Sequence, residues 1–304
     1  MRQPFVTLLC KLIDRPFPGA LAAGLMLLFA ARIATAADDP EIEFRPDIEY
    51  GTGGGEPLRL NLARPKNAAG PLPAVVFIHG GGWSGGKREV HDPQVREWAA
   101  KGYVTATVTY RLLPKHRWPA QIEDVKCAIR YLRTHASELG IDPARIGAIG
   151  FSAGAHLAQM LAVMDPADGL EGTGGWPDQS SKVQAAVSFA GPTDLSRTFP
   201  DTAIKIIENF LGAKPADVPE AVRSASPVSY VDANDAPLLL YHGTLDEIVP
   251  VDQAYEMATR MTKAGAPGRV EILIGAHHGW GAEEATRTFD AADAFLREHL
   301  KAKP

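Results

Sequence analysis

Short apolar runs alternate along most of this chain with longer stretches of helical periodicity. Six runs rich in β-branched and aromatic residues predict strands: 73–80, 103–110, 145–150, 183–191, 236–243 and 269–275. Five segments with apolar residues at helical spacing predict helices: 92–101, 120–139, 153–164, 252–264 and 281–301. Several of the strands are apolar on both faces, which is typical of parallel strands covered by helices. The pattern predicts an α/β fold built on one doubly wound, mostly parallel sheet.

Two further strand-like runs, residues 42–52 and 58–65, predict antiparallel strands at the edge of this sheet. The composition does not change after residue 40 in a way that would mark a second domain, so residues 41–304 are expected to form one domain. Within it, residues 194–235 predict a small cap. Four apolar residues give this segment one amphipathic helix: Ile204, Ile207, Phe210 and Leu211.

The first residues have a different pattern, with three basic residues followed by an apolar run and the small-residue triplet Ala-Thr-Ala at 34–36. This order predicts a signal peptide over residues 1–36, cleaved on export to the periplasm or the medium. The alternative is a transmembrane anchor, but the run is short for a membrane span and Arg32 interrupts it. We therefore expect no stable membrane anchor after cleavage.

Charge and cysteine content narrow the possible partners. The chain has 31 basic and 36 acidic residues, a net charge of −5, and without residues 1–36 the counts become 27 and 35, a net charge of −8. Such a surface disfavours nucleic acid and anionic membranes, which attract basic patches. The shortened chain keeps one cysteine, Cys127, so no internal disulfide is expected. Its position off the apolar stripe of the predicted helix, with no basic residues organised around it, indicates an unreactive thiol.

The segment GFSAG, residues 150–154, fits the pattern G-x-S-x-G directly between a predicted strand and a predicted helix. The turn between them is so sharp that side chains at Gly150 and Gly154 would collide with neighbouring backbone. The strain exposes the hydroxyl of Ser152 above the sheet, with the dipole of the following helix aimed at any negative charge that forms there. Ser152 is therefore the predicted nucleophile.

A serine hydroxyl needs a base, and the base needs an orienting acid. In this architecture the chain order is Ser, then Asp or Glu, then His. Asp246 follows one predicted strand and His278 follows the next, so both should lie at the same edge of the sheet as Ser152. Asp246 and His278 are the predicted acid and base, with Glu247 and His277 as alternatives.

The segment HGGGW, residues 79–83, follows another predicted strand and supplies successive glycines. Their backbone N–H groups can approach an oxygen without side chains in the way. We assign Gly81 and Gly82, with the N–H of Ala153, to an oxyanion hole. A phosphate-binding loop is the alternative, but no Lys-Ser/Thr pair follows at the required spacing.

His79 and His242 are expected to hold the glycine loop and the Asp246 turn, respectively, by hydrogen bonds. The other histidines show no metal-ligand spacing, so no metal or cofactor is predicted.

Several of these segments resemble the α/β-hydrolase superfamily, over nearly everything after residue 45. HGGGW, YRLLPKHRWPAQIEDVKCAIRYL and GFSAGAHLA look like hormone-sensitive-lipase-like esterases. HGTLDEIVP is instead similar to the prolyl-oligopeptidase and dienelactone-hydrolase branch. Together with GLEGTGGW and GAHHGW, the mixture resembles secreted bacterial esterases grouped with feruloyl and acetyl-xylan esterases. The resemblance implies the α/β-hydrolase fold, the same three oxyanion donors, Asp246 as the acid and His278 as the base.

The expected function is a secreted serine carboxylic-ester hydrolase without a cofactor, acting on short-acyl esters or on acetyl or feruloyl esters attached to carbohydrate. Trp83, Trp118 and Trp280 could stack on sugar or feruloyl rings, or could equally belong to the core. The alternatives are a serine exopeptidase-like hydrolase, a lipase for longer acyl chains, a binding module without activity and a structural envelope protein. The sequence predicts no oligomeric state.

Overall fold

The structure is a computed structural model that describes residues 41–301 of the 304-residue chain. The predicted signal peptide, residues 1–36, lies outside the described residues. Within residues 41–301, no helix has both the length and the apolar character needed to cross a membrane.

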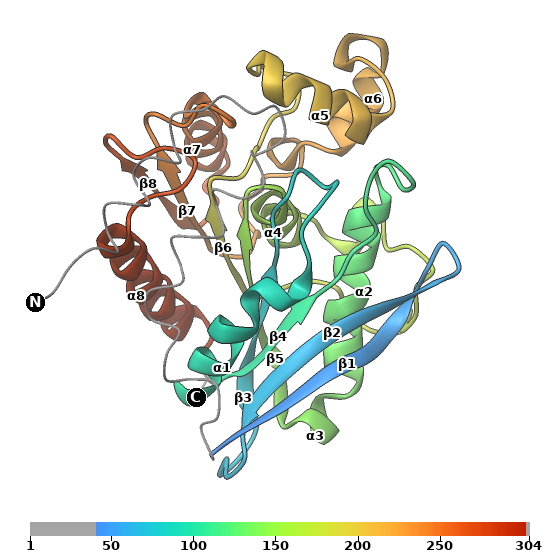
Figure 1. The fold of residues 1–304 in the computed structure, drawn as a ribbon, viewed down its shortest axis with the longest axis vertical. Helices are drawn as coiled ribbons and strands as arrows, with labels where there is room; N and C mark the ends of the chain where they lie inside the picture. The colour runs from blue at the N-terminus through green and yellow to red at the C-terminus, as the bar shows by residue number, and fades with distance from the viewer. Residues whose placement is uncertain (1–40, 302–304) are drawn as a thin grey trace, which may run out of the picture.

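Eight strands form one open sheet in the order β1-β2-β4-β3-β5-β6-β7-β8 (Figure 1). Their bounds are β1 Ile42–Gly53, β2 Glu56–Pro65, β3 Leu72–Ile78, β4 Val104–Val108, β5 Ile141–Phe151, β6 Ala185–Phe189, β7 Leu238–Gly243 and β8 Gly268–Leu273. The pairs β1–β2 and β2–β4 are antiparallel, and every other neighbouring pair is parallel. The predicted doubly wound, mostly parallel sheet with an antiparallel edge is confirmed.

Helices cover both faces of the sheet, as the strands apolar on two faces require (Figure 1). The α-helices are α1 Asp92–Ala100, α2 Ala120–Thr134, α3 Ala136–Leu139, α4 Ala153–Val163, α5 Asp201–Leu211, α6 Pro219–Ser224, α7 Asp252–Ala264 and α8 Ala282–His299. Buried side chains of α1 and α8 pack on one face, and those of α2, α4 and α7 pack on the other. Each face therefore has its own apolar core.

Three local features differ from the sequence prediction. The helix predicted over 120–139 is broken at His135, whose backbone (φ −95°, ψ 17°) departs from α-helical values, although its N–H still donates to the Tyr131 carbonyl at 3.0 Å. The strand predicted from residue 145 begins at Ile141, and its pairing with β3 is irregular between Ile141 and Ile146. Cys127 is fully buried, not off the apolar face, because β1 and the loop around Gly174 cover that side of α2. Burial raises the pKa of its thiol to about 11, which keeps it protonated and unreactive near neutral pH.

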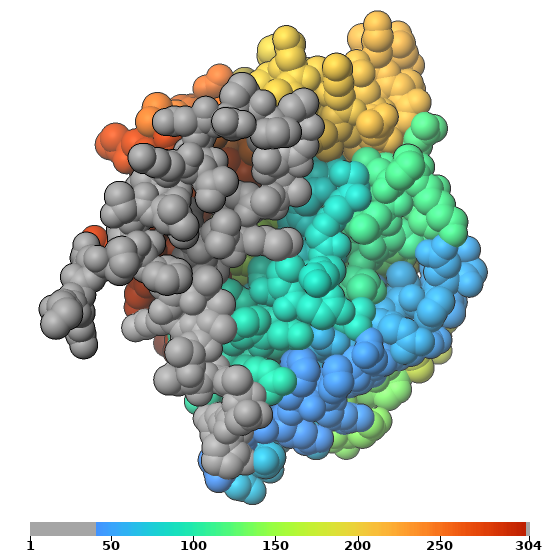
Figure 2. All heavy atoms as spheres, in the orientation of Figure 1, coloured from blue at the N-terminus to red at the C-terminus, as the bar shows by residue number. Residues whose placement is uncertain are grey.

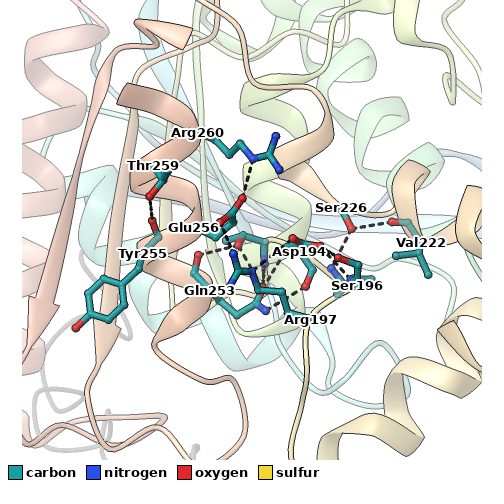
Figure 3. Close-up of polar contacts among 12 residues, drawn as sticks. Asp194, Ser196, Arg197, Val222, Ser226, Gln253, Tyr255, Glu256, Thr259 and Arg260 are labelled. Atoms are coloured by element: carbon teal, nitrogen blue, oxygen red, sulfur yellow. Dashed lines mark hydrogen bonds and ion pairs between the residues drawn. The ribbon is translucent and has the colours of Figure 1, made fainter. Parts of the chain in front are cut away.

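The segment predicted as a cap, residues 194–235, carries α5 and α6 and lies beyond the carboxyl ends of the parallel strands (Figure 1). Its atoms, yellow to gold in Figure 2, form one end of the molecule. Gln253 of α7 is buried and holds the start of the segment, since its amide accepts from the N–H of Asp194 (2.8 Å) and donates to the Asp194 carbonyl (3.1 Å). Ser226 accepts from the N–H of Leu195 at 2.9 Å, so both parts of the segment meet at this root (Figure 3).

We predict a pH-dependent effect of replacing Asp235, which leads from this segment into β7. Burial raises the pKa of its carboxyl to about 7, although the N–H of Asp232 donates to it and lowers the pKa. Because an unfolded Asp has a pKa of about 3.9, the folded state binds this proton more tightly and loses stability as the pH rises from about 4 to 7. Asp235→Asn should therefore raise the free energy of unfolding in urea more at pH 8 than at pH 5. An equal gain at both values, or the same pattern in the exposed control Asp178→Asn, would contradict this account.

Candidate active site

Ser152 sits at the turn where β5 ends and α4 begins, with a positive φ of 52° that non-glycine residues rarely adopt. Its backbone N–H donates to the carbonyl of Phe189 at the end of β6 (2.8 Å), which fixes the turn to the neighbouring strand. A Cβ atom at Gly150 would overlap the carbonyl oxygen of Gly154, and one at Gly154 would overlap the carbonyl oxygen of Ile78 on β3. Both glycines are therefore required by close backbone contacts, and the turn leaves the side chain of Ser152 partly exposed.

His278 and Asp246 reach this serine from the loops after β8 and β7. The Nε2 atom of His278 lies 2.9 Å from Ser152 Oγ, and its Nδ1 atom lies 2.8 Å from Asp246 Oδ2. Because a carboxylate only accepts, we assign the proton of the neutral ring to Nδ1, which leaves Nε2 as an acceptor for the serine hydroxyl. The alternatives His277 and Glu247 instead pair with each other at 3.1 Å, and both side chains are exposed.

The carboxylate of Asp246 is buried and surrounded by donors. Its Oδ1 atom accepts from the N–H groups of Ile248 (2.9 Å) and Val249 (2.8 Å), and Nε2 of His242 lies 3.3 Å from Oδ2. Burial alone would raise the pKa of Asp246. The hydrogen bonds from His242, His278 and Val249 outweigh burial and hold that pKa well below its usual range. The group is therefore ionised near neutral pH, as an acid that orients an imidazole must be.

The glycine loop after β3 lies against the serine turn. A Cβ atom at Gly80 would be 3.2 Å from the Cβ atom of Ser152, and Gly81 and Gly82 have φ values of 117° and 56°. Within residues 41–301, the N–H groups of Gly81, Gly82 and Ala153 have no hydrogen-bond acceptor. Three unsatisfied donors beside a hydroxyl are suited to binding an oxyanion.

His79, the residue that opens this loop, is buried and neutral. Burial lowers the pKa of its imidazole to about 4. Its Nδ1 atom lies 2.8 Å from the Gly80 carbonyl, and the hydroxyl of Tyr110 donates to the His79 carbonyl at 2.8 Å. These contacts agree with the expectation that His79 holds the loop by hydrogen bonds.

Comparison with known proteins identifies the family. The BD-FAE family, a group of hormone-sensitive-lipase-like α/β-hydrolases, matches residues 60–261. The chain belongs to the BD-FAE family. This confirms the resemblance drawn from the glycine-loop and serine motifs, and it confirms the α/β-hydrolase fold.

Relatives and solved structures similar to this BD-FAE chain are described as esterases. Over 254 residues the chain is 32% identical to Esterase LipQ of Mycobacterium tuberculosis, covering 82% of this chain but 60% of LipQ. It therefore spans less than two thirds of that relative. A truncated carbohydrate esterase from gut microbiota has a TM-score of 0.76 and 25% identity, covering 85% of this chain and 96% of that one. Thermogutta terrifontis esterase 2 phosphonylated by sarin has a TM-score of 0.74 and 30% identity, covering 87% and 98%.

The three tryptophans predicted near the site of this BD-FAE chain all have packing partners. Trp83 is buried and stacks on Phe210 of α5, with ring centroids 4.0 Å apart. Trp118 is half-buried, packs on the same phenylalanine and donates from Nε1 to Ser224 Oγ (2.8 Å). Trp280 is half-buried and donates from Nε1 to Thr288 Oγ1 (3.1 Å). Trp83 therefore joins the core to α5, while Trp118 and Trp280 keep part of their surface exposed.

The buried ring of His156 on α4 also reaches the cap segment. It lies one helical turn after Ser152, and its Nε2 atom is 2.7 Å from the carbonyl oxygen of Ala225 at the end of α6. Burial lowers the pKa of His156 to about 4, so the ring is neutral. The position was not predicted to have a role, because helical spacing alone does not show which buried ring faces a distant segment. Across residues 41–301, no group of three or more His, Cys, Asp or Glu side chains is placed to hold a metal ion.

Replacing Gly154 with alanine tests the backbone crossing at the serine turn. The added methyl group would overlap the carbonyl oxygens of Ile78 and His79, which belong to backbone and cannot move aside as a side chain would. We expect Gly154→Ala to lower the free energy of unfolding by at least about 3 kcal/mol, the upper end for overpacked sites. Urea unfolding measures this. Gly70→Ala, where the methyl group would meet no atom within 4 Å, should change stability by less than about 1 kcal/mol. Similar losses in the two variants would contradict the close crossing.

Proposed function

We propose that this protein is a serine carboxylic-ester hydrolase, exported by the leader predicted over residues 1–36 and acting on short-acyl or carbohydrate-linked esters. The observation that carries the proposal is the hydrogen-bonded series from Ser152 Oγ through His278 to Asp246, beside three N–H groups without acceptors. The esterase names of LipQ and of the two similar solved structures support the same reaction class.

In the proposed reaction, Ser152 Oγ attacks the ester carbonyl while Nε2 of His278 takes its proton. Asp246 holds the ring and stabilises the imidazolium that forms. The N–H groups of Gly81, Gly82 and Ala153 bind the tetrahedral oxyanion, with the N-terminus of α4 adding its dipole. His278 then gives the proton to the leaving alcohol, and water repeats the cycle on the acyl-enzyme.

The position of α5 supports a preference for small acyl groups. Ile206 of α5 lies so close to the glycine loop that a Cβ atom at Gly82 would be 3.0 Å from its Cγ2 atom. The helix therefore leaves little space on that side of the proposed oxyanion hole. The similarity to a gut carbohydrate esterase adds carbohydrate-linked esters as a candidate substrate class.

The nucleophile is tested by Ser152→Ala. Without the hydroxyl no acyl-enzyme can form, so turnover of an activated ester should fall by at least about a thousandfold. A fluorophosphonate should add its mass to the wild-type protein and not to this variant, as measured by mass spectrometry. The exposed Ser229→Ala serves as the matched control and should keep wild-type turnover and labelling. Full activity in Ser152→Ala would end the proposal.

The substrate class is tested by comparing acetyl, octanoyl and feruloyl esters on the wild-type protein. We expect kcat/KM to be at least about ten times higher for the acetyl than for the octanoyl ester, because α5 limits the space beside the glycine loop. A preference for octanoyl esters would favour the lipase alternative. Release of an aminoacyl arylamide with all esters untouched would favour the exopeptidase-like alternative.

A further inference from the structure

His242 is a fully buried histidine on β7, four residues before Asp246. Its Nε2 atom lies 2.7 Å from the carbonyl oxygen of Val249 and 3.3 Å from Asp246 Oδ2. Because a carbonyl oxygen can only accept, Nε2 must carry a proton. One N–H group is therefore shared between the Val249 carbonyl and the carboxylate.

These contacts form a closed series of hydrogen bonds that joins His242, Val249 and the carboxylate of Asp246. Val249 donates its N–H to Asp246 Oδ1 at 2.8 Å and accepts from His242 with its carbonyl, so one residue is held by both partners. The carboxylate is thus fixed at Oδ1 by the backbone of its own turn. At Oδ2 it lies between two imidazoles, His242 on one side and His278 at 2.8 Å on the other. Rotation of the carboxylate would break contacts at both oxygens.

The second ring nitrogen of His242, Nδ1, indicates why a histidine stands at this position. Nδ1 of His242 is buried and has no hydrogen-bond partner within the described residues. An unpaired buried acceptor costs stability, and an apolar side chain of similar size would avoid that cost. The ring therefore has its useful polar contacts at Nε2 alone, where it meets the acid.

We propose that His242 is a positioning residue that acts through Asp246, aiming Oδ2 at Nδ1 of His278 and so holding His278 in the tautomer whose Nε2 faces Ser152. The inference rests on the proposed function, because it assigns His242 a part in the same reaction. Within the described residues, no hydrogen bond joins His242 to Ser152 or to the glycine loop, so its effect should fall on the chemical step and not on substrate binding.

Three substitutions separate this role from packing. His242→Leu removes the donor and keeps a buried side chain. His242→Gln keeps an N–H donor at a reach similar to Nε2, and His242→Asn keeps an amide that is too short to reach the acid. Tyr241→Phe, the neighbour on β7 whose buried hydroxyl has no partner in the described chain, is the matched control. Thermal unfolding shows which variants fold, and the comparison of Gln with Asn remains decisive if the Leu variant does not.

We expect His242→Leu and His242→Asn to lower kcat for an activated ester by about ten- to a hundredfold, the size of a lost hydrogen bond to a charged group, with KM within twofold of wild type. The rate of fluorophosphonate labelling at Ser152 should fall in parallel. His242→Gln should recover at least about a third of the wild-type kcat, and Tyr241→Phe should match wild type.

An unchanged kcat in the Asn variant would overturn the inference. An equal loss in the Gln and Asn variants would overturn it too, because it would indicate that the shape of the side chain matters and its hydrogen-bond donor does not. A rise in KM without a fall in kcat would overturn it as well. If the wild-type protein neither hydrolyses esters nor reacts with the fluorophosphonate, the proposed function itself is wrong and the inference falls with it.

Discussion

The backbone of the serine turn crosses the end of β3 with no space for a methyl group at Gly154. This contact fixes how closely the start of α4 packs against β3, and therefore fixes the position of Ser152. It also fixes the glycine loop, because that loop is the direct continuation of β3 and lies against Ser152 at Gly80. A single backbone contact thus positions both the hydroxyl and the donors beside it, and no side chain takes part in it.

Asp246 and His278, the proposed acid and base, are brought to the same place by the order of the strands. Since β5, β6, β7 and β8 are neighbours and run parallel, their carboxyl ends meet at one edge of the sheet. The last two loops are also joined directly, because Leu245 donates its N–H to the Ala276 carbonyl at 2.8 Å. A Cβ atom at Gly243 would overlap that same carbonyl. Asp246 and His278 approach each other because the loops that carry them pack together. These loops follow β7 and β8, which are paired within the sheet.

Much of this could be predicted from the sequence, because the apolar runs of the strands and the glycines of tight turns depend on local geometry. The mostly parallel sheet, the helices on both of its faces and the antiparallel edge were predicted from that pattern, whereas the order of the strands was not. The break at His135 and the burial of Cys127 were not predicted. The break depends on the backbone conformation of a single residue, and the burial depends on contacts with β1 and the loop around Gly174, which are distant in sequence. Spacing alone does not separate His277 from His278, and the choice of His278 came from the resemblance. In the structure the backbone of the loop directs His278 to Ser152 and His277 to Glu247.

The cap segment shows how closely the site and its surroundings are coupled. Phe210 of α5 stacks on Trp83, the residue that ends the glycine loop, and the carbonyl of Ala225 lies within hydrogen-bonding distance of His156, one turn along the helix that starts beside Ser152. The segment is also held at its root by Gln253. It therefore rests on the glycine loop, on the serine helix and on α7 at once. We therefore expect a change that moves α5 to shift the loop that carries the proposed oxyanion donors, so the proposed substrate space and the proposed reaction centre depend on the same contacts.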